Sequence, residues 1–249
     1  MMLNIAAYVF VAVDDADALS IRVREKAEAA ALRGSVLVAP EGINLFLAGR
    51  EAPLRGFIDW LREDPRFAGI NIKESWSEVL PFARLKVKRK DEIIAFRRDG
   101  AVPIERERAP AVEPRTLARW IEQGHDDVGK PLVLLDTRNR EEVGFGSFVG
   151  ALTLPIDNFT ELPDAIAPHR EVLRNATVVS FCTGGIRCEK AALWLRDDGM
   201  DNLLQLDGGI LGYFEQVGGF GYDGRCFVFD ERVALDPCLQ PLVDHDAAA

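Results

Sequence analysis

Apolar positions recur with two different periods along the first hundred residues. Four segments are apolar and rich in β-branched residues, which predicts β-strands at residues 4–13, 35–39, 43–48 and 70–76. Two segments between them, residues 16–32 and 52–62, place apolar side chains at helical spacing, and Gly34 fits just past the end of the first. Residues 40–42 predict a hairpin turn. This order of elements is that of a ferredoxin-like α+β domain.

A run of basic residues follows these elements. Its cations are Arg84, Lys86, Lys88, Arg89 and Lys90. On a strand alternate side chains share a face, so Leu85 and Val87 would point away from Arg84, Lys86 and Lys88. Two interpretations stay open. The lysines protect a solvated edge strand from pairing with another chain, or the run contacts the phosphates of an RNA backbone.

The second half of the chain alternates short apolar strands with helices. Strands are predicted at residues 132–135, 177–181 and 202–206, and helices at 114–123, from about 186 to Gly199, and at 210–216. Strands that are apolar on both faces and alternate with helices are typical of a parallel sheet with helices on both sides. The second half is therefore predicted to be an α/β domain with a central parallel sheet.

Length and charge distribution indicate two domains. The chain has 249 residues and a net charge of −10, which divides into +1 for residues 1–110 and −11 for the rest. Polar residues and prolines between Asp99 and Pro114 predict a linker. We expect an N-terminal domain at residues 1–98, a linker at 99–111, a second domain at 112–222 and a C-terminal segment at 223–249.

Composition narrows the class of protein. The acidic total argues against a general nucleic-acid coat protein. No apolar run approaches the ~18 residues of a membrane span, and the first residues lack the basic start and cleavage site of a secretory signal. We expect a cytoplasmic protein with no membrane partner.

Reactive chemistry is concentrated in one loop, where a predicted strand runs into a predicted helix. The predicted active-site residues are Cys182, Thr183, Gly184, Gly185, Ile186 and Arg187. Backbone N–H groups and the positive end of the helix dipole favour the Cys182 thiolate at this place, and Arg187 can add a positive charge. Gly184 and Gly185 let the backbone curl around the sulfur. Such a thiolate can accept a sulfur atom and hold it as a persulfide.

The neighbours of Cys182 limit this chemistry. A phosphatase loop needs one residue more between cysteine and arginine than the four present here, so the loop suits sulfur better than phosphate. Cys188 either resolves Cys182 by forming a disulfide or is a small apolar residue beneath the helix. The remaining cysteines, Cys226 and Cys238, and the three histidines have no ligand spacing, and no dinucleotide-binding glycine motif is present. We expect no metal and no recognisable cofactor.

Several motifs together resemble a known family. They are DTRN at 136–139 with Glu142 and Gly146, CTGGIRCEKA at 182–191, GGI at 208–210, APEGIN at 39–44, PFARLKVK at 81–88 and CFVFDERV at 226–233. The second half resembles a rhodanese domain. Nearly the whole chain is similar to the oxygen-dependent tRNA uridine hydroxylases, rhodanese-related proteins that convert the wobble uridine of certain tRNAs to 5-hydroxyuridine.

The resemblance implies an acylphosphatase-like ferredoxin fold followed by a rhodanese domain. It implies that Cys182 is the catalytic, persulfide-forming cysteine, that Asp136 and Arg138 support its loop, and that tRNA is the substrate. O2 as co-substrate, an unidentified electron donor and a sulfur or electron donor protein as partner follow from the same resemblance.

Three functions remain to be separated. The first is tRNA hydroxylation, with the hypothesis that the Cys182 thiolate adds to C6 of the uracil and activates C5 for attack by oxygen. The second is a sulfurtransferase that passes sulfane sulfur through a Cys182 persulfide, which the loop alone would predict. The third is a non-catalytic binding module. Intact Cys182 and Arg187 argue against the third, and the N-terminal domain and residues 226–233 argue against the second.

Overall fold

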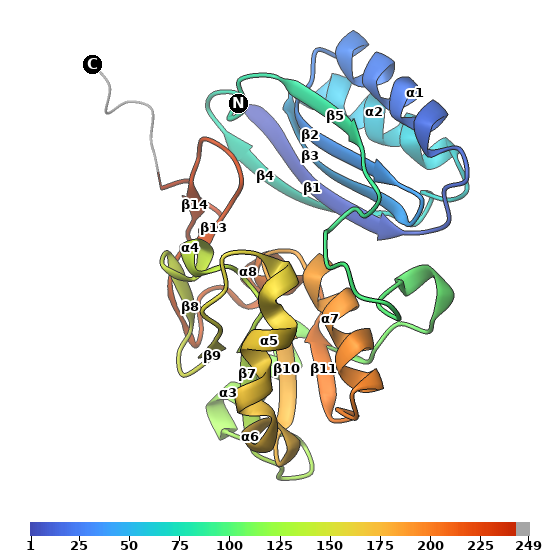
Figure 1. Ribbon diagram of the computed structural model, residues 1–249. Helices are drawn as coiled ribbons and strands as arrows, with labels where there is room; N and C mark the ends of the chain where they lie inside the picture. Colours follow the sequence, from blue (N-terminus) through green and yellow to red (C-terminus); the bar gives the residue numbers. More distant parts are fainter. Residues whose placement is uncertain (243–249) are drawn as a thin grey trace. The chain divides into compact units, whose positions relative to one another are not determined.

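The protein consists of two compact units in a computed structural model, which describes residues 1–242 apart from the side chain of Glu105 (Figure 1). Residues 1–95 and 230–232 form the first unit, and residues 96–229 and 233–242 form the second. Residues 99–111, expected to be a linker, belong to the second unit. Ala101 and Ala109 are buried there, because this stretch contributes apolar side chains to the fold.

The first unit is the expected ferredoxin-like domain. Its elements are β1 (Met2–Phe10), α1 (Ala16–Ala29), β2 (Arg33–Ala39), β3 (Gly42–Gly49), α2 (Glu51–Glu63), β4 (Asn71–Ser77) and β5 (Leu85–Arg89). The sheet order is β4-β1-β3-β2-β5, and β5 pairs parallel to β2 at the edge. Helices α1 and α2 cover one face of the sheet (Figure 1), and their apolar residues form a core with alternate strand residues such as Leu45, Leu47 and Val36.

Two boundaries in the first unit differ from the sequence expectation. Strand β1 ends at Phe10, and the next residues bond to the β2–β3 turn instead, with Val11 N donating to Glu41 O at 3.0 Å. Helix α1 ends at Ala29, and Gly34 is a strand residue rather than the end of the helix. A Cβ at Gly34 would lie 2.0 Å from Phe46 O, so glycine is needed for the close pairing of β2 and β3.

The second unit is an α/β domain built on the strand order β6-β11-β10-β7-β9, in which every pair is parallel. The main elements are β6 (Ala111–Val112), α3 (Pro114–Gln123), β7 (Leu132–Asp136), α4 (Arg140–Val143), β9 (Leu152–Thr153), β10 (Thr177–Phe181), α7 (Ile186–Asp197), β11 (Leu203–Leu206) and α8 (Gly209–Val217). The smaller elements are η1 (Pro103–Glu105), β8 (Gly146–Phe148), η2 (Phe159–Glu161), α5 (Leu162–Ile166), η3 (Ala167–His169), α6 (Arg170–Arg174), β12 (Tyr222–Gly224), β13 (Cys226–Phe227) and β14 (Ala234–Leu235).

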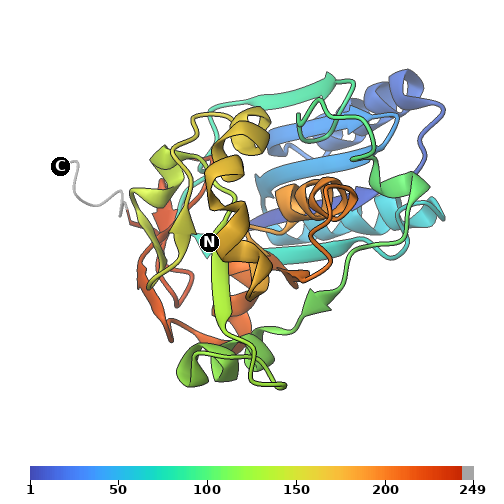
Figure 2. The ribbon, with the colours of Figure 1, turned by 60° about the horizontal axis from the view of Figure 1, so that its bottom comes forward.

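Alternation along β10 places helices on both faces of this sheet, a layering that can be followed in Figures 1 and 2. Val179 and Phe181 pack with residues of α3 and α8. Ser180, which points the opposite way, is a polar neighbour of Cys188 of α7. The buried strand β10 therefore lies between the two helical layers. The residue that follows it, Cys182, lies at the carboxyl edge of the sheet. No helix within residues 1–242 is long and apolar enough to cross a membrane.

Candidate active site

Cys182 lies immediately after β10 and before α7, at the carboxyl edge of the parallel sheet. Its side chain is 0% exposed, and its Sγ accepts a hydrogen bond from Gly185 N at 3.1 Å. Gly185 has a φ of +101°, a conformation that glycine adopts readily, and this turns its N–H toward the sulfur. The backbone N–H of Arg187 and the thiol of Cys188 also stabilise the anionic form of Sγ. The loop therefore wraps the sulfur with donors, as the sequence predicts.

These surroundings favour the thiolate of Cys182. Burial opposes ionisation, but the hydrogen bond from Cys188, the charge of Arg187 and the backbone N–H groups together lower the pKa of Cys182 from 9.0 to about 6. Burial and the neighbouring Cys182 raise the pKa of Cys188 well above its usual value. The pair is therefore an ionised sulfur beside a protonated one. Because Cys182 has no exposed surface, its reaction with a molecule from solution requires the surrounding residues to move apart.

A buried carboxylate, Glu142, holds Arg187 in place. Arg187 Nη1 donates to Glu142 Oε2 at 2.5 Å, and Nη2 donates to Oε1 at 2.6 Å. Thr183 Oγ1 also donates to Oε1, at 3.2 Å, so one carboxylate ties together two residues of the cysteine loop. Burial raises the pKa of Glu142, but the stronger combined effect of Arg187 and the N–H of Asn139 lowers it. Sequence reasoning named Glu142 only within a motif and missed this role.

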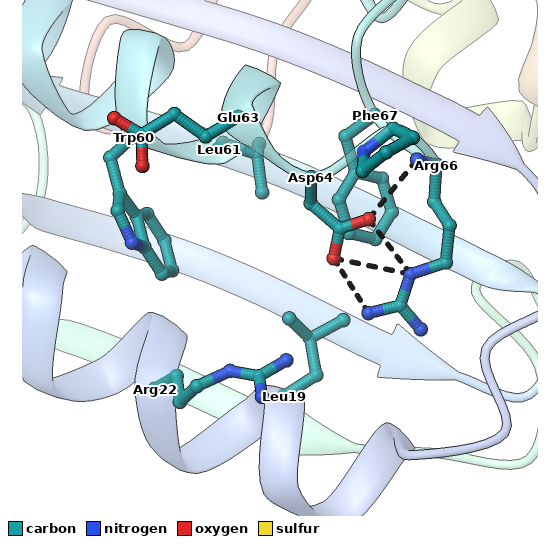
Figure 3. A pocket seen from close by; sticks show the side chains of 9 residues that line it. Leu19, Arg22, Trp60, Leu61, Glu63, Asp64, Arg66 and Phe67 are labelled. Carbon is teal, nitrogen blue, oxygen red and sulfur yellow. Dashed lines mark hydrogen bonds and ion pairs between the residues drawn. The ribbon is translucent and has the colours of Figure 1, made fainter.

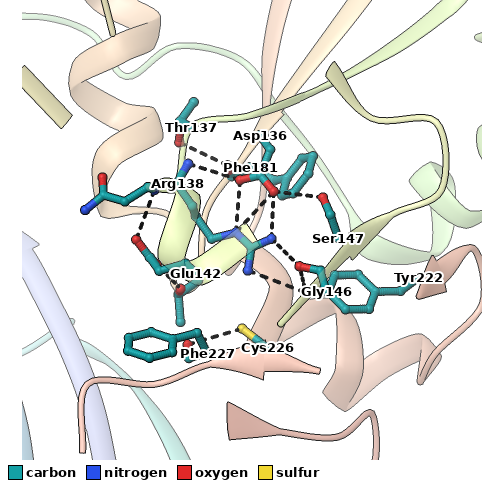
Figure 4. Close-up of polar contacts among 12 residues, drawn as sticks. Asp136, Thr137, Arg138, Glu142, Gly146, Ser147, Phe181, Tyr222, Cys226 and Phe227 are labelled. Carbon is teal, nitrogen blue, oxygen red and sulfur yellow. Dashed lines mark hydrogen bonds and ion pairs between the residues drawn. The ribbon is translucent and has the colours of Figure 1, made fainter. Parts of the chain in front are cut away.

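A second buried ion pair, Asp136 with Arg138, braces the neighbouring strand end (Figure 4). Both side chains are 0% exposed, and Arg138 Nη2 donates to Asp136 Oδ2 at 2.6 Å and to Gly146 O at 2.7 Å. Ser147 Oγ donates to the same carboxylate oxygen at 2.8 Å. Strand β7, which ends at Asp136, is thereby fixed to β8.

The start of α8, at Gly208 and Gly209, packs against the backbone of the cysteine loop. Ile210 N donates to Cys182 O at 3.0 Å, and Leu211 N donates to Thr183 O at 3.1 Å. A Cβ at Gly209 would lie 2.6 Å from Cys182 O, and the φ of Gly209 is +62°. Only glycine allows the start of α8 to approach the loop this closely.

Comparison with known proteins gives the family. A UPF0176 acylphosphatase-like domain matches residues 2–93, and a rhodanese-like domain matches residues 113–216. The chain is 65% identical over 249 residues to the tRNA uridine(34) hydroxylase of Xanthomonas axonopodis pv. citri (strain 306), with both chains covered completely. It is 57% identical to the tRNA uridine(34) hydroxylase of Xylella fastidiosa (strain M23), covering 100% of this chain and 96% of that one. The chain belongs to the tRNA uridine(34) hydroxylase family.

Membership of the hydroxylase family accounts for both units, because the acylphosphatase-like and rhodanese domains coincide with the two folds seen here. The expected rhodanese loop is assembled as one site. The basic run belongs to the first unit. Lys86 and Lys88 lie on β5 of the first unit with exposed side chains, and Val87 between them is buried, as the alternation predicts. Arg89 pairs with Asp91 at 2.6 Å.

A separate pocket lies between α1 and α2 of the first unit (Figure 3). Its volume is about 450 Å³, and its lining includes Trp60, Asp64 and Arg66. The guanidinium of Arg66 is already held by Asp64 at 2.7 Å and by Asp15 at 2.5 Å. The charge of Arg66 is thus already paired within the fold. Within residues 1–242, no group of three or more His, Cys, Asp or Glu residues could hold a metal ion, and His245 lies outside this range.

Proposed function

We propose that this protein hydroxylates uridine 34 of tRNA to 5-hydroxyuridine, with O2 as co-substrate and Cys182 as the nucleophile. The observation that carries the proposal is 65% identity over the complete chain with a tRNA uridine(34) hydroxylase. The cysteine loop supports it, since a thiolate held by N–H donors is the chemistry that addition to an electron-poor pyrimidine needs. Because the proposed substrate is tRNA, we propose that the reaction takes place in the cytoplasm.

The chemical step begins with addition of the Cys182 thiolate to C6 of the uracil. Negative charge then develops at C5 and on the C4 carbonyl oxygen, and C5 becomes reactive toward O2. Among the described residues, Nε of Arg187 is a buried donor with no hydrogen-bond partner. This N–H is available to the developing oxyanion while the other two nitrogens of Arg187 stay bonded to Glu142. Asp136 and Arg138 act indirectly, as positioning residues.

The basic run on β5 is the proposed contact for tRNA phosphates. Strand β5 is an edge strand, and Lys86 and Lys88 are paired in register with Ser35 and Leu37 of β2. Their side chains project from the same face as each other and are exposed, so both ammonium groups can reach a phosphate. Arg89 is less suited to this role because its guanidinium is held by Asp91.

The test is a complementation experiment. A strain that lacks the protein receives the wild-type chain, Cys182→Ser or, as a control at an exposed thiol, Cys238→Ser, and tRNA nucleosides are measured by mass spectrometry. We expect 5-hydroxyuridine to disappear in the deletion strain and to return with the wild-type chain and Cys238→Ser only. Unchanged 5-hydroxyuridine in the deletion strain would overturn the proposal. So would full restoration by Cys182→Ser, or a purified protein that transfers sulfur from thiosulfate and hydroxylates no tRNA.

A further inference from the structure

A second buried thiol, Cys188, lies near the first. Cys188 is the third residue of α7, its side chain is 0% exposed, and its thiol lies close enough to the Cys182 sulfur to lower the pKa of Cys182. Its other polar neighbours are Thr137 Oγ1 at 3.6 Å and Ser180. Simple packing beneath the helix would need only a small apolar side chain. Here the sulfur instead has polar neighbours, Thr137 Oγ1 and the Cys182 sulfur.

Hydroxylation of uracil by O2 requires two electrons in addition to those of the C5–H bond. One oxygen atom enters the product and the other leaves as water, so O2 must receive two electrons and two protons from a reductant. Two thiols that become a disulfide release two electrons and two protons. Cys182 and Cys188 are such a pair, two buried neighbours at the site of reaction.

We propose that Cys188 is a second catalytic residue and that the Cys182–Cys188 pair is the immediate reductant of the hydroxylation, so that each turnover leaves a disulfide between them. This inference rests on the hydroxylase function proposed above. The overall reaction is uridine plus O2 plus two thiols, giving 5-hydroxyuridine, water and one disulfide.

The steps proceed in this order. The Cys182 sulfur bonds to C6, C5 passes an electron pair to O2 and forms a C5–O bond, and the outer oxygen takes up a proton to give the hydroperoxide. The Cys188 sulfur attacks the outer oxygen, the O–O bond breaks, and C5 keeps a hydroxyl group while Cys188 becomes a sulfenic acid. Loss of the C5 proton and of the C6–S bond then restores the C5=C6 double bond and releases the Cys182 thiolate. This thiolate displaces hydroxide from Cys188, which forms the S–S bond and, with a proton, water.

The different ionisation of the two sulfurs suits this order. Cys182, as the thiolate, adds first and leaves last, and Cys188 stays protonated until the hydroperoxide is in place. An external thiol, small or protein-bound, then reduces the disulfide by exchange. Because both sulfurs are buried, that exchange needs the same opening of the site that admits the base.

The test is a single turnover of the full chain without external thiol. The protein is reduced, freed of reductant under nitrogen and mixed with total tRNA from the strain that lacks it. Air is admitted, and samples are quenched with acid and N-ethylmaleimide. Nucleoside mass spectrometry measures 5-hydroxyuridine, and peptide mapping without reduction measures the Cys182–Cys188 disulfide. Matched samples contain no tRNA, Cys188→Ser or Cys238→Ser, and thermal unfolding checks that each variant is folded.

We expect product and disulfide to appear in equal amounts in the wild type and in Cys238→Ser. We expect little disulfide without tRNA and at least a tenfold loss of product in Cys188→Ser. Product without an equal amount of disulfide in the wild type overturns the inference and leaves the hydroxylase function intact, and this readout does not depend on the variant's folding. Wild-type product yield from Cys188→Ser also overturns it. A wild type that forms no product even with excess dithiothreitol means that the proposed function itself is wrong.

Discussion

Replacement of Glu142 by glutamine is the sharpest test of how the site is held together. The Glu142 and Arg187 side chains are 1% and 6% exposed, and two charge-assisted hydrogen bonds join them. Removing one partner of a buried ion pair costs about 3–5 kcal/mol, because the other charge stays buried without compensation. Two charge-assisted hydrogen bonds at about 1.5–3 kcal/mol each give a similar total. Glutamine keeps one acceptor oxygen, so we expect Glu142→Gln to lower the free energy of unfolding by about 3 kcal/mol, the lower end of the range for a broken buried pair.

The assay is urea unfolding followed by tryptophan fluorescence and circular dichroism. The matched control is Asp157→Asn, which removes the carboxylate from an ion pair with Arg140 that is exposed on the surface of the same unit. This control should leave the unfolding midpoint unchanged, since exposed pairs contribute little. A Glu142→Gln protein whose free energy of unfolding lies within about 1 kcal/mol of wild type would refute the reasoning.

The same substitution has a second, independent consequence. Without the Glu142 carboxylate, the positive charge of Arg187 acts on Cys182 uncompensated, so the pKa of Cys182 should fall further. The rate of iodoacetamide alkylation against pH, with the modified residue identified by peptide mapping, measures this shift. An upward shift would show that Glu142 acts on the thiolate in some other way.

Three further predictions concern the loop and the basic run. Because the pKa of Cys182 in the folded protein is lowered from 9.0 to about 6, the rate of its alkylation should have a midpoint near pH 6, and a midpoint near pH 9 would contradict the lowered pKa. The thiolate's contribution to the free energy of unfolding is complete above pH 9 and is lost as the pH falls through 6. Gly209→Ala should abolish hydroxylation and, in urea unfolding, destabilise the protein by more than the roughly 1–2 kcal/mol expected for an alanine in the left-handed conformation. The control is Gly124→Ala, where φ is +76° and an added Cβ would meet nothing within 4 Å, so only the smaller loss is expected. Lys86→Glu with Lys88→Glu should weaken tRNA binding and flatten its dependence on salt concentration in filter-binding assays, and an unchanged slope would leave the pair with the role of protecting a sheet edge.

Periodicity was sufficient for most of the fold. Helix α3 and strand β10 have the predicted bounds, and α7 begins at Ile186, as predicted. Periodicity failed where contacts with distant parts of the chain determine the local structure. Gly34 resembles a helix end in sequence, but its place in β2 depends on Phe46 O, a partner 12 residues away. The 99–111 stretch looks like a linker because its buried alanines are separated by polar residues.

The sequence by itself determined the order of elements, the parallel sheet and the reactive loop at Cys182, since strand, loop and helix are contiguous there and the loop's donors are its own backbone. The tertiary structure decided what surrounds that loop. Glu142 lies 45 residues before Arg187, and only folding shows that its carboxylate neutralises the arginine and fixes the loop. Likewise the sequence left Cys188 as either a resolving thiol or a packing residue, and only the folded structure shows it as a buried neighbour of the Cys182 sulfur. The local pattern of residues specifies the backbone of each element. Buried charge pairs and neighbouring thiols come from elements that are brought together only by folding, so the local pattern does not predict them.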